Sequence, residues 1–247
     1  MRSVSLSIVC VVLVSIVATR GQERTADSSS NTTTAAPAPL LDRFLATADT
    51  PPIAYRAIRY LTAQAGERKA SLKARTSYDP ATGFTFEVLE ESGSGLIRSK
   101  VLRAALEAEK SAKQAAQRSR AALTTENYAF DSAVPAGEGR QRIGIHPRRK
   151  EPMMIDGSIM LASLDADLLR VEGLLVKRPS FWTRRVEVVR DYARIGGMRV
   201  PVSMTSTADV LFVGKSTFEM RYEYESVNGR GVNAAAAEVA STVASKR

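Results

Sequence analysis

The amino-acid sequence predicts an α+β domain in which helices lie against one face of a large, curved antiparallel sheet. From residue 128 onward, segments with alternating apolar and polar residues follow one another, which is the period of half-buried strands. Turn residues separate these segments at hairpin-like intervals, and an earlier segment, residues 97–123, has helical spacing. With 247 residues, 44% of them hydrophobic, the chain can bury the core of one or two domains.

The first 21 residues are typical of a signal peptide. A short positive start with Arg2 precedes an apolar run, residues 4–18, which is shorter than the roughly 20 residues that span a membrane. The single cysteine, Cys10, lies inside this run, which argues against a cysteine nucleophile, a cysteine-ligated metal or a disulfide scaffold. We therefore expect an exported protein.

Residues 22–39 and 230–247 flank the predicted domain. Residues 25–39 read TADSSSNTTTAAPAP and offer almost no large apolar side chain for burial, so we expect residues 22–39 to form a flexible linker. Residues 230–247 are Ala-rich without a large apolar face, which indicates a flexible tail. The folded domain then comprises residues 40–229.

The first helix is predicted over residues 51–65. Thr50 and Pro51 suit a helix start and Gly66 suits its end. Apolar residues recur between these points at helical spacing, at Ala54, Ile58, Leu61 and Ala65.

A hairpin and a second helix follow. Residues 70–78 and 84–88 alternate, and Pro80 and Gly83 between them suit a tight reversal. Residues 97–123 predict a long amphipathic helix with Lys and Arg mostly on one side. The two helices, residues 51–65 and 97–123, would cover the sheet.

The remaining segments predict strands. The clearest comprises residues 218–225, where apolar and aromatic residues alternate with Glu and Arg. The predicted strands are residues 143–145, 159–161, 169–176, 186–192, 198–204, 210–213 and 218–224. The turn signals between them are Asp156-Gly157, Asp165, Gly196-Gly197, Gly214 and Asn228-Gly229.

A sheet of about eight or more strands usually curls. Its concave apolar face is then either filled by side chains or only partly covered by the helices, and the second arrangement leaves a cavity for a hydrophobic ligand. The sequence leaves both arrangements open.

Residues 156–229 resemble the C-terminal half of outer-membrane lipoprotein-sorting proteins of the LolA/LolB-like superfamily. In that half a series of long strands includes the element v-r-y-x-x-i-x-G-x-x-l-P, which residues 188–201 match. The leader, a helix near the mature N-terminus and a hairpin before the long helix agree with the same order of elements. The resemblance implies an unclosed half-barrel covered by helices, whose apolar inside accepts acyl chains in the bacterial periplasm.

The chain also departs from the best-known carriers of that superfamily. The second half of the long helix is strongly basic, and residues 128–150 are rich in Gly and Arg. We therefore expect the same fold and the same apolar class of ligand, with a different cargo.

Apolar rows on the predicted strands are candidates for lining an acyl-binding cavity, although the same alternation also makes an ordinary core. Trp182 suits either the mouth of a cavity or a sheet edge packed on the core. The candidate ligand-binding residues are Phe84, Phe86, Val88, Trp182, Met198, Val200, Val202, Met204, Phe218, Met220 and Tyr222.

The basic residues Arg148, Arg149 and Lys150 are candidates for facing anionic lipid headgroups or a membrane surface, in a chain of net charge +9. The alternative is a solvated basic loop. Export argues against nucleic acid as the partner.

Catalysis would depend on His146, the single histidine of the chain. One histidine without cysteines or a neighbouring carboxylate cluster does not complete a usual zinc site. The sequence therefore predicts no metal, no cofactor, no catalytic residue and no enzyme activity.

The function that the sequence favours is binding of a lipid, a lipoprotein acyl chain or another apolar molecule, with lipoprotein sorting and transient membrane contact as the setting. The alternative is a sensor or interaction module of the same fold that binds a partner protein in the envelope. An apolar pocket that stays open under the helices would favour the first function, and a solidly packed sheet face the second.

Overall fold

A computed structural model describes residues 39–47, 54–110, 120–179, 183–211 and 214–232 of the chain. The predicted signal peptide, nearly all of the predicted linker and the predicted tail beyond residue 232 lie outside the described residues. The first two residues of that tail, Arg230–Gly231, form a short strand that pairs with the strand before it. No helix among the described residues is long and apolar enough to cross a membrane.

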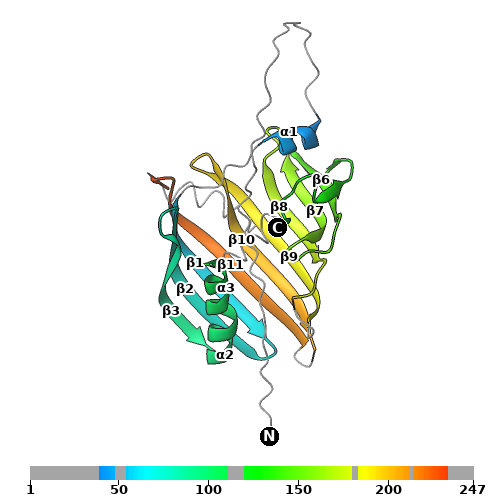
Figure 1. The fold of residues 1–247 in the computed structure, drawn as a ribbon. Helices are drawn as coiled ribbons and strands as arrows, with labels where there is room; N and C mark the ends of the chain where they lie inside the picture. The colour runs from blue at the N-terminus through cyan, green and yellow to red at the C-terminus, as the bar shows by residue number, and fades with distance from the viewer. Residues whose placement is uncertain (1–38, 48–53, 111–119, 180–182, 212–213, 233–247) are drawn as a thin grey trace, which may run out of the picture.

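The described strands form one antiparallel sheet (Figure 1). Its order is β3-β2-β1-β11-β10-β9-β8-β7-β6-β4, with β12 beside β11 and β5 beside β6 at its margins. The strands are β1 (Tyr55–Ala65), β2 (Arg68–Asp79), β3 (Gly83–Gly93), β4 (Tyr128–Phe130), β5 (Val134–Pro135), β6 (Arg140–Pro147), β7 (Ile155–Ala162), β8 (Leu168–Leu175), β9 (Thr183–Ile195), β10 (Met198–Val210), β11 (Gly214–Val227) and β12 (Arg230–Gly231). The predicted large, unclosed antiparallel sheet is confirmed.

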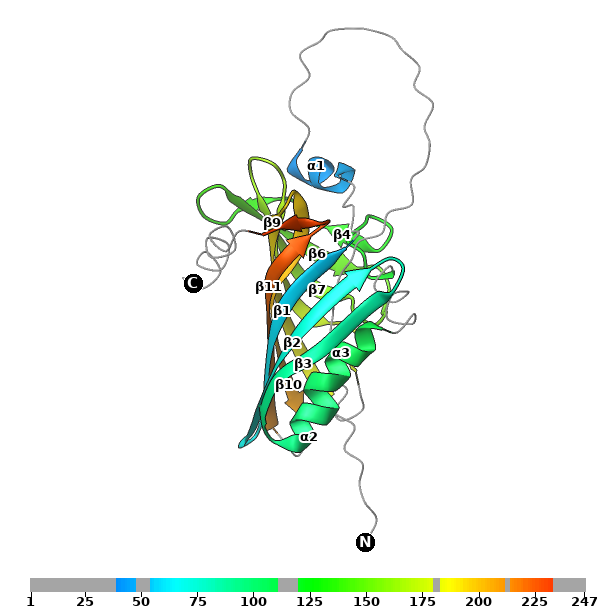
Figure 2. The same cartoon turned by 90° about the vertical axis from the view of Figure 1, so that its left-hand side faces the viewer.

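Two helical segments accompany the sheet. One is α1 (Leu40–Ala46), at the end of the sheet where β7 turns into β8. The other runs without a break through α2 (Gly95–Ile97), the π-helical η1 (Arg98–Arg103) and α3 (Ala104–Glu109). Figure 2 shows this second segment against one face of the sheet, beside β3, and η1 contacts β1, β2 and β3.

The short helix α1 is fixed by polar and aromatic contacts. The Arg43 guanidinium donates hydrogen bonds to the carbonyls of Ser163 and Leu164, each at 2.9 Å. The Arg199 guanidinium lies over the ring of Phe44, 5.5 Å from its centroid, and the Asp167 carboxylate accepts hydrogen bonds from Arg199. Burial alone would raise the pKa of Asp167, but hydrogen bonds from neighbouring arginines outweigh it and lower that pKa.

One row of side chains on the inner face shows how the sheet buries its core. The row crosses eight strands through successive cross-strand pairs, and every member is buried. It consists of Leu72, Leu61, Met220, Met204, Arg190, Val171, Ile159 and Ile143. Because one row joins most of the strands, the sheet folds over a single core.

The predicted helix over residues 51–65 is wrong, since residues 55–65 form β1. Its inner positions alternate through Tyr55, Ala57, Arg59 and Leu61, all of them buried. A buried charged residue in the middle of the strand breaks the apolar alternation in the sequence, so a helical spacing fits the remaining apolar residues equally well. A helical cover from this segment therefore does not exist.

The hairpin predicted at residues 70–88 is confirmed as β2 and β3. The helix predicted over residues 97–123 is correct to Glu109 and again at residue 120; residues 111–119 lie outside the described residues, and residues 121–127 form turns and bends. Of the strand predicted over residues 210–213, Val210 is the last residue of β10 and residue 211 is a turn, and residues 212–213 lie outside the described residues.

The turn predicted at Asp156-Gly157 is wrong, because both residues lie in β7. Gly157 pairs with Gly173 of β8, and the two backbones approach so closely that a Cβ on Gly157 would lie 2.1 Å from the carbonyl oxygen of Glu172. Glycine at this position lets two strands approach closely. In a single sequence, such a glycine cannot be distinguished from a glycine in a turn.

Replacing Gly157 with alanine is expected to destabilise the fold by about 1–3 kcal/mol, because the new methyl group forces two strands apart. The matched control is Gly231→Ala, in a strand position where an added Cβ meets nothing within 4 Å, and it should change stability by less than about 0.5 kcal/mol. Urea unfolding of both variants measures the difference. Equal stabilities would contradict the close approach of β7 and β8.

Candidate ligand pocket

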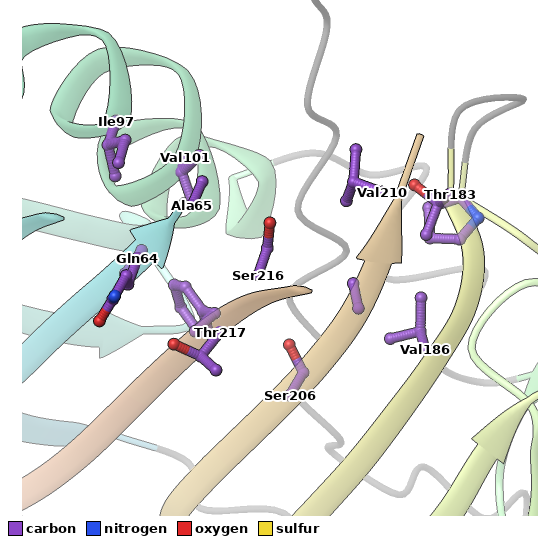
Figure 3. Close-up of a pocket in the computed structure, with 14 residues that line it drawn as sticks. Gln64, Ala65, Ile97, Val101, Thr183, Val186, Ser206, Val210, Ser216 and Thr217 are labelled. Atoms are coloured by element: carbon purple, nitrogen blue, oxygen red, sulfur yellow. The ribbon is translucent and has the colours of Figure 1, made fainter. Parts of the chain in front are cut away.

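An apolar pocket lies at the end of the sheet where β10 and β11 approach their connecting turn (Figure 3). Its cavity volume is about 60 Å³, and the space between its lining atoms is about 600 Å³ when the part open to solvent is counted. The described residues that line it are Ala63, Gln64, Ala65, Ile97, Val101, Pro179, Thr183, Val186, Ser206, Ala208, Val210, Ser216, Thr217 and Phe218.

The pocket exists because small side chains occupy inner positions at this end of the sheet. Ala65, Ser216, Ala208 and Val186 form one cross-strand row over β1, β11, β10 and β9. Farther up the sheet, the Leu, Ile and Met side chains of the buried row fill the corresponding space. Small residues at the end of the strands therefore leave a volume that the helical segment after β3 does not fill.

The roof of the pocket is the helical segment after β3. Ile97 and Val101 line the pocket from α2 and η1. The π-helical turn is clamped by Glu91, whose carboxylate accepts hydrogen bonds from Arg98 at 2.6 Å and from Arg103 at 2.8 Å. These arginines are five residues apart, which is the spacing that a π-helix brings onto one side, and π-helical turns often lie at functional sites.

A buried ion pair joins the roof to the middle of the inner face. The Arg59 guanidinium on β1 lies 2.5 Å from one oxygen of the Glu109 carboxylate at the end of α3, and the two side chains are 1% and 4% exposed. The Tyr55 hydroxyl accepts a hydrogen bond from Arg59 at 2.9 Å. The rings of Tyr222 and Phe84 lie 4.7 and 5.0 Å from the guanidinium carbon.

The surroundings keep Arg59 charged. Burial alone would lower the pKa of Arg59, but the Glu109 carboxylate outweighs burial and that pKa is raised. Burial raises the pKa of Tyr222 well above its usual value. The middle of the inner face is thus occupied by an ion pair within an aromatic cage.

The structure divides the sequence-predicted ligand residues between the core and the pocket. Phe218 lines the pocket. Phe84, Val200, Met204, Met220 and Tyr222 are buried in the core, and Phe86, Val88, Met198 and Val202 are partly buried against it. Trp182 lies outside the described residues. Their role in binding a ligand stays a prediction.

The pocket residues that the sequence analysis missed are mostly small or belong to the helix, notably Ala208, Ser206, Ser216 and Val101. The available signal was the change from bulky to small residues at the inner positions of the C-terminal part of β10.

The basic residues that follow β6 make hydrogen bonds to the neighbouring turn. The Arg148 side chain donates hydrogen bonds to the carbonyls of Thr125 and Tyr128, and Arg149 donates to the Asn127 side chain. Lys150 is exposed. Arg148 and Arg149 therefore hold the turn before β4, and a headgroup contact by the three residues stays a prediction.

His146 lies on the exposed outer surface between two carboxylates. Its Nδ1 is 2.9 Å from Asp156 and its Nε2 is 3.1 Å from Asp131. Hydrogen bonds to Asp131 and then to Asp156 raise the pKa of His146. No group of three or more His, Cys, Asp or Glu residues that could hold a metal ion occurs in the described part of the chain.

Removing either partner of the buried ion pair should destabilise the fold by about 3–5 kcal/mol, because the other charge is left buried without its partner. We expect this loss for Arg59→Met and for Glu109→Met, and a much smaller loss for the double variant, which buries no lone charge. A double-mutant cycle by urea unfolding measures the coupling. Additive losses would show that the two groups do not depend on each other.

The bridge at His146 predicts a pH-dependent stability. Because the pKa of His146 is raised above 6.5 in the folded protein, protonation stabilises the fold; this contribution is complete below 6.5 and is lost as pH rises through the folded value. The urea midpoint of the wild type, measured relative to that of His146→Gln, should therefore decrease as pH rises above about 6.5 through the folded pKa. A constant difference over that range would contradict the bridge.

Comparisons with known proteins give a structural likeness. No protein-family model and no curated protein matches the chain. Among solved structures, a LolA superfamily protein from Nitrosomonas europaea matches with a TM-score of 0.34 and 7% sequence identity, over 78% of this chain and 93% of that chain. The fold class rests on the strand order described above.

Proposed function

We propose that this protein is an exported, periplasmic, non-enzymatic protein that binds a lipid, a lipoprotein acyl chain or another apolar ligand in its half-barrel. The observation that carries the proposal is the apolar pocket that stays open between the helical roof and the small side chains of β1, β10 and β11. An open pocket under the helical cover is the feature that distinguishes a carrier from a packed sheet.

Binding would be driven by removing methylene groups from water. Each buried methylene contributes about 0.8 kcal/mol, so a chain of several carbons offsets the cost of association. Ile97, Val101, Val186 and Phe218 provide apolar contacts from both the roof and the sheet. A role in lipoprotein sorting agrees with this use of the pocket, and Lys150 and its neighbours would provide attraction to a negative membrane surface.

A second candidate function is an interaction module that binds an envelope protein. It is favoured by the middle of the inner face, where Met204 and Met220 are 1% and 0% exposed and the Arg59 ion pair fills the space under the roof. In this alternative the pocket at the sheet end is a small part of a surface that recognises a protein, and no lipid accompanies the purified chain.

The decisive variant fills the pocket. Ala208→Trp places an indole among Ala65, Val186 and Ser216 and should remove most of any lipid that accompanies the protein, as measured by mass spectrometry of the extract from the full chain exported to a bacterial periplasm. The matched control is Thr205→Trp, on the exposed outer face of the same strand, which should retain the lipid.

Circular dichroism shows whether both variants are folded. Lipid at the same level in both folded variants would place the ligand elsewhere than in this pocket, and a wild type without lipid would favour the interaction module.

A further inference from the structure

The wall of the pocket carries hydroxyl groups and no charge. Among the described lining residues none is Asp, Glu, Lys, Arg or His. In Figure 3 the hydroxyl of Ser216 points from β11 into the space below the helix, and the hydroxyl of Ser206 lies on the neighbouring strand. This wall differs from the rest of the inner face, where charged groups such as Arg59 are buried with partners.

The Ser216 hydroxyl is a buried polar group without a hydrogen-bond partner among the described residues. A buried hydroxyl that makes no hydrogen bond destabilises a fold, so such groups usually have a partner in the chain, in ordered water or in a ligand. Across the sheet, Ser216 pairs with Ala65 and Ala208, whose methyl groups offer no donor or acceptor.

We propose that the pocket selects a ligand whose apolar chain ends in an uncharged hydrogen-bonding group, an ester or amide carbonyl or an alcohol, and that Ser216 bonds this group. This inference rests on the proposed function and specifies its ligand. A hydroxyl can donate to a carbonyl and can accept from an alcohol, so one side chain serves both. An ionised carboxylate or phosphate is disfavoured, because the described residues of the pocket wall provide no cation to balance its buried charge.

The test uses three ligands with the same twelve-carbon chain. Methyl dodecanoate, 1-dodecanol and sodium dodecanoate compete with the neutral fluorescent probe N-phenyl-1-naphthylamine for the delipidated full chain at about pH 8, where the acid is ionised. The ester and the alcohol should bind at least about tenfold more tightly than dodecanoate. Equal affinities for the three would overturn the inference and leave the proposed function standing, whereas no binding of the probe or of any ligand would overturn both.

Ser216→Ala tests the hydrogen bond. The substitution should lower the affinity for the ester and for the alcohol about fivefold, which is the effect of one neutral hydrogen bond. The affinity for dodecanoate should not change. Because the hydroxyl has no hydrogen-bond partner within the described residues, the Ser216→Ala variant without ligand should be at least as stable as the wild type without ligand. Lower stability with unchanged ligand preference would show a structural role and contradict the proposal.

Ala208→Arg tests the charge argument in the opposite direction. A guanidinium on the pocket wall should raise the affinity for dodecanoate relative to the ester, while Thr205→Arg on the outer face of the same strand should not. An identical response of the two variants would contradict selection by the pocket.

Discussion

A single sheet of this size must bury its own inner face, and that constraint organises the molecule. Among the described residues α1, the segment from α2 to α3 and residue 120 are helical, and these are too short to cover a flat sheet of this width. Curling solves the problem, because inner side chains from strands far apart then meet each other across the concave face. The buried row from Leu72 to Ile143 lies on this face, and Gly157 and Gly173 let β7 and β8 approach closely.

The helical roof adds what curling cannot provide. Glu109 brings a negative charge to Arg59, and Glu91 fixes the π-helical turn from the edge strand. The two contacts hold the roof at different points, one over the aromatic cage and one beside the pocket. A densely packed middle and an open end can therefore coexist under one short helix.

How well the sequence predicts a strand depends on which residues occupy the inner positions of that strand. In β11 the alternation from Phe218 to Glu225 is clean, and it predicted both the strand and its buried side. In β1 the buried charge of Arg59 occupies an inner position, so the segment does not show the apolar alternation that predicts a half-buried strand. The turn predicted at Gly157 in β7 is wrong for a similar reason, since glycine occurs both in turns and where two strands pack closely.

The pocket could not be predicted in the same way, because an empty volume is a property of facing elements and not of any one segment. Small residues in β10 and β11 would bury tightly under a bulkier roof, and only their position under Ile97 and Val101 leaves space. The large apolar residues that the sequence singled out mostly stabilise the sheet on which that space depends.

The pairing of β1 with β11 has a kinetic consequence. Tyr55 and Val227, from opposite ends of the domain, are neighbours in the sheet, so the meander of β1 to β3 has no anchoring strand until nearly the whole domain has been synthesised. Contacts of such long sequence separation make folding slow, because the chain loses loop-closure entropy before the contacts between the strands can stabilise it. Until then one edge of β1 stays unpaired, open to mispairing with other chains. A chain with this topology completes its sheet in one late step.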